Sequence, residues 1–208
     1  MRKSLLIIIL SVLVAAVASA QEELPVGTLA PDFTATNHQG KTIDLKQSLE
    51  KGPVVIVFYR GEWCKHCNNY MHNLQDSLPM INALGATVIA ITPEQNESID
   101  ETIQKTGASF SIIWDKDHRI MDEYKVSFKL KGTKNTAYKV AGINVRKASG
   151  SDHRILPVPA TYIIGTDGRI KGGYFNTDYT LRMPVKDILE VLDLNNNSEA
   201  SEQIRKEK

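Results

Sequence analysis

The chain contains 208 residues, of which 42% are hydrophobic and 24% are charged, and it holds only two cysteines. This length fits one domain of ordinary size, and the composition is typical of a globular protein rather than a disordered or collagen-like one. With 25 lysines and arginines against 24 acidic residues, the chain lacks the basic excess that a general nucleic-acid-binding protein needs. Two cysteines are also too few to form a disulfide framework for such a domain.

The N-terminal segment has the pattern of an export signal. Arg2 and Lys3 precede an apolar run from Leu5 to Ala18, and Ala18-Ser19-Ala20 matches a small-residue cleavage site. We therefore expect residues 1–20 to be a cleaved signal peptide. The mature protein is then exported to the periplasm or the extracellular space, with no membrane attachment after cleavage. An uncleaved N-terminal anchor is the alternative.

Strand-like and helix-like patterns alternate after this segment. A short hairpin is predicted at 32–45, and β-branched apolar runs at 53–59 and 86–92 predict buried strands. Pro79 is expected to kink or interrupt one of the helices. The other predicted elements are strands at 110–114, 160–165 and 169–175 and helices at 65–84, 97–106, 119–124 and 185–192. Strands that alternate with helices indicate an α/β fold around one central sheet, preceded by the N-terminal hairpin.

We expect one domain over residues 21–193, followed by a polar, disordered tail over residues 194–208. Within the domain, segment 127–158 does not follow the alternation and carries seven cations against one anion, Asp152. The expected interpretation is a solvated insertion, and the alternative is a docking surface for an acidic partner. The seven cations are Lys129, Lys131, Lys134, Lys139, Arg146, Lys147 and Arg154.

The two cysteines form a Cys-x-x-Cys motif, Trp63-Cys64-Lys65-His66-Cys67, between the strand predicted at 53–59 and a predicted helix. A thiol at a helix N-terminus faces unpaired N–H groups and the positive end of the helix dipole, which favour the thiolate. We therefore expect a redox-active pair. Cys64 should be the more exposed and more acidic thiol, and Cys67 should attack a mixed disulfide formed at Cys64.

Lys65, His66 and Trp63 are the candidates for tuning the thiolate, and intervening cations make the disulfide form more oxidising. Three other interpretations compete. A structural disulfide would close only a tiny loop, which gives little entropic stabilisation. A zinc site needs about four ligands, of which this motif supplies two. The third alternative is a pair of buried, inert thiols.

The segment 156–162, with sequence LPVPATY, leads directly into a predicted strand. Pro159 either marks the edge of that strand or follows a cis peptide bond. A cis proline beside the cysteine pair would expose the backbone of Val158 to an extended substrate peptide. The sequence leaves the isomer open.

Several ordered motifs resemble the alkyl hydroperoxide reductase/thiol-specific antioxidant family, in its peroxiredoxin-like branch of the thioredoxin-fold superfamily. The matching segments are VGTLAPDF at 26–33, GKTIDL at 40–45, FYRGEWCKHC at 58–67, LPVPAT at 156–161 and NTDYTLR at 176–182. Agreement of several motifs in order is more specific than any one of them. The resemblance implies a thioredoxin-like fold with a central mixed sheet flanked by helices, and thiol redox chemistry.

One motif departs from the family's peroxidases, whose active-site pattern is FYPxxxTxxC. Aligned on Phe58 and Tyr59, Cys67 takes the position of the peroxidatic cysteine and Cys64 that of the hydroxyl residue. Arg60 stands in place of the proline. The same spacing is similar to a thioredoxin-type pair with Cys64 as the nucleophile.

The leading hypothesis is an exported thiol-disulfide oxidoreductase that uses no metal or other cofactor. Its substrates would be protein thiols or disulfides, and an external thioredoxin-like reductant or oxidant would restore the pair. One alternative is a hydroperoxide peroxidase in which Cys67 is peroxidatic and Cys64 resolving. A copper-binding thioredoxin-fold chaperone is the other, although such relatives space their cysteines as CxxxC. Candidate substrate-binding residues are Val158, Pro159, Arg60 and Arg154.

Overall fold

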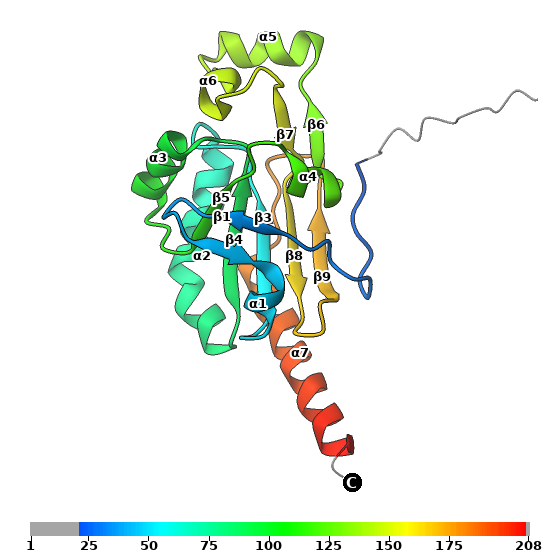
Figure 1. Cartoon of the computed structure of the whole chain (residues 1–208). Coiled ribbons are helices and arrows are strands. Elements are labelled where there is room, and N and C mark those ends of the chain that lie inside the picture. Colours follow the sequence, from blue (N-terminus) through cyan, green and yellow to red (C-terminus); the bar gives the residue numbers. More distant parts are fainter. Residues whose placement is uncertain (1–20, 207–208) are drawn as a thin grey trace, which may run out of the picture.

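A computed structural model of the protein describes residues 21–206 (Figure 1). The expected signal peptide, residues 1–20, lies outside the described residues. The strands are β1 (Thr34–Thr36), β2 (Thr42–Asp44), β3 (Val54–Phe58), β4 (Thr87–Thr92), β5 (Ser111–Trp114), β6 (Ser127–Lys129), β7 (Ile155–Pro157), β8 (Ala160–Ile164) and β9 (Ile170–Phe175). The helices are α1 (Leu45–Leu49), α2 (Lys65–Ala83), α3 (Asn96–Thr106), α4 (Arg119–Glu123), α5 (Gly132–Val140), α6 (Val145–Ser149) and α7 (Val185–Lys206).

A five-stranded sheet with the order β5-β4-β3-β8-β9 forms the centre of the molecule. The strands β3, β4 and β5 are parallel, whereas β8 is antiparallel to β3 and β9 is antiparallel to β8. Every residue of β3 is buried, as expected for a β-branched strand that is covered on both faces. The α/β class and the central mixed sheet are therefore confirmed.

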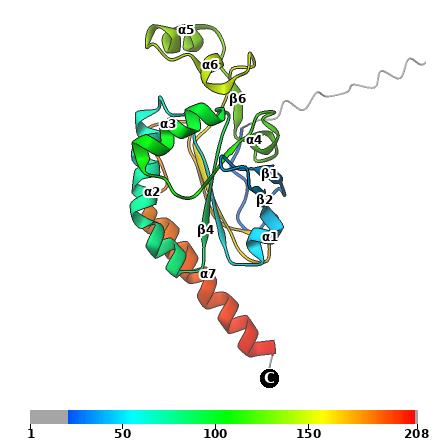
Figure 2. The same ribbon diagram turned by 60° about the vertical axis from the view of Figure 1, so that its left-hand side comes forward.

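Helices cover both faces of this sheet (Figure 2). Val55 and Val57 of β3 pack with α2, α3 and α7 on one face. Val54, Ile56 and Phe58 point the other way, into a second core with α1 and α4. This alternation follows from the two-residue period of a strand. The expected N-terminal hairpin is confirmed as β1 and β2, which pair antiparallel.

The helix α2 continues through Pro79, so of the two expected effects of this proline, interruption of the helix is wrong, and a kink stays a prediction. Pro79 lies on the exposed face, whereas Leu74 and Ile81 on either side of it are fully buried. Packing of both halves against the core outweighs the hydrogen bond that a proline removes.

The helix α7 reaches Lys206, so the expected end at Leu192 and the expected disordered tail do not hold for residues 194–206. Asn195 is buried, and Nδ2 of Asn196 donates a hydrogen bond to the carbonyl oxygen of Leu84 at the end of α2. These tertiary contacts favour a helix where the local composition does not. Within residues 21–206, no helix combines the length and the apolar character that a membrane crossing requires.

The cationic insertion is folded and lies beyond one end of the central sheet (Figure 1). The strands β6 and β7 pair antiparallel, and α5 and α6 lie between them in the chain. Leu130, Val145 and Leu156 form a small core of their own. Lysines 129, 131, 139 and 147 are exposed, as expected for a solvated insertion.

Candidate active site

The two cysteines lie at the N-terminus of α2, where the sequence predicted them. Cys64 is the N-cap residue of α2, and its Sγ accepts a hydrogen bond from the backbone N–H of Cys67 at 3.3 Å. The two residues form a disulfide, with their Cα atoms 5.2 Å apart. Cys64 is 5% exposed and Cys67 is 0% exposed. The order of these values agrees with the expectation that Cys64 is the more exposed residue, and both residues are buried.

An arginine that the sequence analysis missed touches the buried sulfur. Nη2 of Arg182 donates to Sγ of Cys67 at 3.1 Å. Nη1 of Arg182 donates to the carbonyl oxygens of Tyr179 and Leu181, at 2.6 Å each, and so fixes the guanidinium. Burial lowers the pKa of Arg182 to about 10, which leaves it charged at neutral pH. Arg182 ends the NTDYTLR motif, and that resemblance was the available signal for it.

A second arginine, Arg60, is 3% exposed and lies at the end of β3. Its Cζ is 5.1 Å from the ring centroid of Trp63, 5.2 Å from that of Tyr138 and 4.3 Å from that of Tyr179. Burial first, and then the nearby charge of Arg182, lower the pKa of Arg60 to about 10. Such cation–π contacts orient a guanidinium without neutralising it.

The three candidate tuning residues surround Cys64. Lys65 and His66 are exposed on the first turn of α2. The ring of His66 meets that of Tyr179 edge-on at 6.0 Å, and the ring of Trp63 meets that of Tyr138 edge-on at 5.3 Å. Their placement permits an effect on the thiolate, and that effect stays a prediction.

Two cavities flank Arg60. The cysteine-side cavity, of about 290 Å³, is lined by Arg60, Trp63, Cys64, Lys65, His66 and Tyr138 among others. The proline-side cavity, of about 190 Å³, is lined by Arg60, Tyr138, Val158, Pro159 and Tyr179 among others. Both cavities are lined by Arg60, Ala137, Tyr138 and Tyr179, so they adjoin at these residues.

Two backbone groups beside Pro159 are hydrogen-bonded within the protein. The peptide bond between Val158 and Pro159 is trans. The N–H of Val158 donates to the carbonyl oxygen of Val126 at 2.7 Å, and the carbonyl oxygen of Pro159 accepts from the N–H of Asn176 at 3.3 Å. The cis bond on which the expected exposure of the Val158 backbone depended is therefore absent, and the N–H of Val158 is already bonded within the protein. Both side chains instead line the proline-side cavity.

The remaining arginine candidate, Arg154, is not placed with the cysteines. It is absent from the walls of the cysteine-side and proline-side cavities. Its carbonyl oxygen accepts a hydrogen bond from the N–H of Leu130, which joins β7 to the end of β6. Arg60 and Arg154 were expected to bind substrate, whereas the arginine that contacts Cys67 is Arg182.

A buried carboxyl group lies behind the cysteine loop and was also missed. Glu94 is 1% exposed, and its Oε2 accepts a hydrogen bond from the N–H of Glu62 at 2.7 Å. Burial raises the pKa of Glu94 to about 8. The carbonyl oxygen of Gly61 accepts a hydrogen bond from the N–H of Cys64 at 3.1 Å, so Glu94 contacts the turn that positions the first cysteine.

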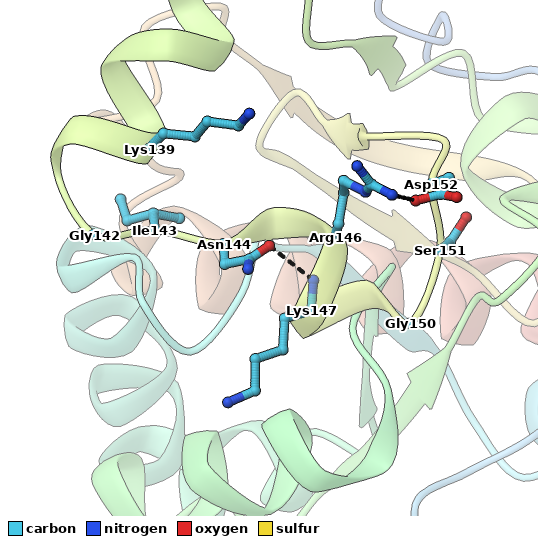
Figure 3. Close-up of a pocket in the computed structure, with 9 residues that line it drawn as sticks. All are labelled: Lys139, Gly142, Ile143, Asn144, Arg146, Lys147, Gly150, Ser151 and Asp152. Atoms are coloured by element: carbon cyan, nitrogen blue, oxygen red, sulfur yellow. Dashed lines mark hydrogen bonds and ion pairs between the residues drawn. The ribbon is translucent and has the colours of Figure 1, made fainter.

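A larger cavity, of about 780 Å³, lies between α5 and α6 and contains neither cysteine (Figure 3). Lys139, Arg146 and Lys147 line it, and Arg146 pairs with Asp152. The docking of an acidic partner on this insertion stays a prediction. In the part of the chain that the structure describes, no three His, Cys, Asp or Glu side chains are grouped so that they could hold a metal ion.

Two sets of known proteins are similar to this chain. Thiol-disulfide oxidoreductase ResA of Bacillus thuringiensis (strain Al Hakam) is 29% identical over 107 residues, which cover 51% of this chain and 61% of the relative. Putative peroxiredoxin bcp of Haemophilus influenzae is 31% identical over 103 residues, which cover 50% of this chain and 66% of the relative. The chain therefore spans less than two thirds of either relative.

Solved structures show the same fold at lower identity. Peroxidoxin BcpB from Mycobacterium tuberculosis aligns with a TM-score of 0.63 at 16% identity, covering 81% of this chain and 96% of that one. Plasmodium vivax 2-Cys peroxiredoxin aligns with a TM-score of 0.63 at 17% identity, covering 83% and 98%. The expected thioredoxin-like fold is confirmed by these peroxiredoxin neighbours.

The family model of the AhpC/TSA family matches residues 26–172. This range is well over half of the chain and includes both cysteines, Arg60 and Pro159. The family that the sequence motifs indicated is therefore confirmed, and the chain belongs to the AhpC/TSA family.

Proposed function

We propose that the protein is an exported thiol-disulfide oxidoreductase that exchanges disulfides through Cys64 and Cys67. The observation that carries this proposal is the asymmetry of the pair. Cys64 lies at the helix N-terminus on the wall of the cysteine-side cavity, whereas Cys67 is fully buried behind it. This asymmetry supports Cys64 as the sulfur that meets a substrate and Cys67 as the sulfur that completes the exchange.

In the reducing direction, the Cys64 thiolate attacks one sulfur of a substrate disulfide. A mixed disulfide forms, and the first substrate thiolate leaves and takes up a proton. The Cys67 thiolate then attacks Sγ of Cys64, which releases the second substrate thiolate and forms the Cys64–Cys67 disulfide. The guanidinium of Arg182 stabilises the Cys67 thiolate that this second step needs. Run in reverse, the pair donates its disulfide to a reduced substrate.

The relatives support the same chemistry, because one is a thiol-disulfide oxidoreductase and another a putative peroxiredoxin. Turnover requires an external partner, a thioredoxin-like reductant or oxidant, that returns the pair to its starting state. Export to the periplasm or the extracellular space rests on the signal pattern of residues 1–20. That pattern also motivates the proposal that the mature protein begins at residue 21.

Trapping of mixed disulfides tests the function. With Cys67→Ser, we expect exported partner proteins to accumulate in complexes with Cys64 that dithiothreitol dissolves, because the second step is blocked. Cys64→Ser is the matched control and should trap few partners. Complexes only with Cys64→Ser would reverse the two roles, and complexes with neither variant would contradict exchange with proteins.

A peroxidase reaction is the second candidate, and the contact between Arg182 and Cys67 favours it. The Cys67 thiolate would attack a hydroperoxide oxygen, forming a sulfenic acid and releasing an alcohol or water. The Cys64 thiolate would then attack that sulfur, releasing water and forming the disulfide. Stopped-flow oxidation of the reduced protein by hydrogen peroxide decides the matter. A rate no faster than that of a free thiol would exclude this reaction.

A further inference from the structure

Arg60 is a buried cation that lacks an anionic partner. Among the described residues it forms no ion pair, and its Nε is buried without a hydrogen-bond partner. The charge of Arg182, which has the same sign, lowers the pKa of Arg60 further after burial has lowered it. Burial of an uncompensated charge is costly. The arrangement therefore favours any anion that can reach the guanidinium.

The three rings around Arg60 fix where such an anion can bind. Trp63, Tyr138 and Tyr179 lie within 5.2 Å of its Cζ and hold the guanidinium by cation–π contact. Ring faces accept hydrogen bonds less well than oxygens do, and no hydrogen bond satisfies Nε of Arg60. A carboxylate is the group whose two oxygens match the fork of donors of a guanidinium.

The place of Arg60 connects such an anion to the redox pair. Arg60 and Cys64 both line the cysteine-side cavity, and Arg60 also lines the proline-side cavity. Their volumes, about 290 and 190 Å³, suit a small molecule rather than a folded loop. Ala137 and Tyr138 of α5 line both cavities, so the insertion contributes a wall of this site.

Two of the backbone groups with which an extended peptide could pair beside Pro159 are already occupied. The N–H of Val158 and the carbonyl oxygen of Pro159 are both bonded within the protein. A small molecule needs no such pairing. This difference favours a low-molecular-weight ligand over a protein segment.

We propose that Arg60 binds the carboxylate of a low-molecular-weight thiol, and of its disulfide, while the sulfur reacts at Cys64. This inference rests on the proposed disulfide exchange and names its substrate class. One substrate thiolate attacks Sγ of Cys64, which forms a mixed disulfide and releases the Cys67 thiolate beside Arg182. A second thiolate attacks the substrate sulfur of that mixed disulfide and releases the Cys64 thiolate. Two thiols are oxidised to one disulfide, and the protein pair gains two electrons and, after protonation, two protons.

The test compares 3-mercaptopropionate with its methyl ester as reductants of the oxidised mature protein. Rates are followed by acid quenching and alkylation, and both are expressed per thiolate. We expect the acid to react about tenfold faster than the ester, as one charge-assisted hydrogen-bonded pair allows. Arg60→Met should bring this ratio close to one. Arg60→Lys should retain part of it, because the charge remains but the fork of donors does not.

Lys65→Gln is the matched control, because it removes an exposed cation from the same cavity. It should keep most of the preference. If Lys65→Gln lowered the ratio of the acid rate to the ester rate as much as Arg60→Met does, the preference would come from the overall positive potential of the cavity, and the proposal would be overturned. A ratio near one in the unaltered protein would also overturn it. A preference seen only with an acidic cysteine-containing peptide would overturn it in favour of a protein substrate.

Dithiothreitol, a neutral reductant, distinguishes failure of the carboxylate site from failure of the proposed disulfide exchange. If it reduces the pair reversibly while the acid and the ester react equally, disulfide exchange stands and the carboxylate site is wrong. If it yields no reversible dithiol, the proposed function itself fails. Circular dichroism of each Arg60 variant verifies its fold. The readout is the ratio of the acid rate to the ester rate, so a substitution that changes the reactivity of Cys64 toward both reductants equally leaves the ratio unchanged.

Discussion

Nη2 of Arg182 lies 3.1 Å from Sγ of Cys67, across a separation of 115 residues in the chain. The segment after β9 thus supplies a cation to the sulfur that is hidden from solvent. The N-terminus of α2 supplies its own positive potential to Cys64. Each sulfur of the pair therefore has a source of positive potential, and both sources stabilise the reduced form, in which the sulfurs can ionise.

Removal of the Arg182 charge should make the pair a weaker oxidant. In Arg182→Met the Cys67 thiolate loses its neighbouring cation, so the reduced form is destabilised and the reduction potential falls by about 30 mV. Arg182→Lys should give a smaller fall. The measurement is equilibration with dithiothreitol buffers of known potential, followed by alkylation and mass analysis.

Lys186→Met is the matched control for this prediction, because Lys186 is an exposed cation just after the same segment. Its potential should be unchanged. A fall of equal size in both variants would attribute the effect to net charge, and no fall in Arg182→Met would remove Arg182 from the tuning of Cys67.

Glu94 should make stability depend on pH. Its carboxyl has a pKa of about 8 in the folded protein, against an ordinary value of 4.5. Between these values the folded state holds one more proton, so the free energy of unfolding falls as the pH rises from about 4.5 to about 8. Glu94→Gln removes this dependence. Its stability relative to the unaltered protein should rise by on the order of 3 kcal/mol between pH 5 and pH 8, measured by urea unfolding.

The exposed acid Glu101 offers the control for this experiment. Glu101→Gln should leave the pH profile close to that of the unaltered protein. If the free energy of unfolding depended on pH in the same way for Glu94→Gln and the unaltered protein, Glu94 would be ionised in the folded state across the neutral range.

The outer half of α7 should contribute to stability. Truncation after Asp193 removes buried Asn195 and the bond from Asn196 to Leu84. It also removes Glu199, whose Oε1 accepts from Thr166 at 2.9 Å. We expect a loss of about 2 kcal/mol in the free energy of unfolding, from chemical denaturation. Truncation after Ala200 keeps all three residues and should cost less than about 0.5 kcal/mol. Equal stability of both truncated proteins would support the domain boundary at residue 193 that the sequence predicted.

The sequence was most informative where local patterns determine structure. The β-branched run of β3 and the Cys-x-x-Cys motif at the start of α2 lie next to each other in the chain, so their geometry could be predicted. Arg182 and Glu94 reach the site only through tertiary folding. Asn195 is buried and Asn196 bonds to Leu84, 112 residues away in the chain, which is why the composition of residues 194–206 was misleading.

Gly61 is the position where a single methyl group should disturb the site most. Its φ is 151°, and a Cβ there would collide with Oε1 of Glu94 and lie 2.8 Å from Nε1 of Trp63. We expect Gly61→Ala to lower the free energy of unfolding by about 3 kcal/mol and to slow disulfide exchange at Cys64, because the turn must shift. Gly40→Ala is the matched control: φ there is 77° with no atom within 4 Å of the added Cβ, so only the backbone strain of about 1 kcal/mol applies. Thermal and urea unfolding measure both. Equal costs at the two glycines would show that Glu94 does not pack against the cysteine loop as described.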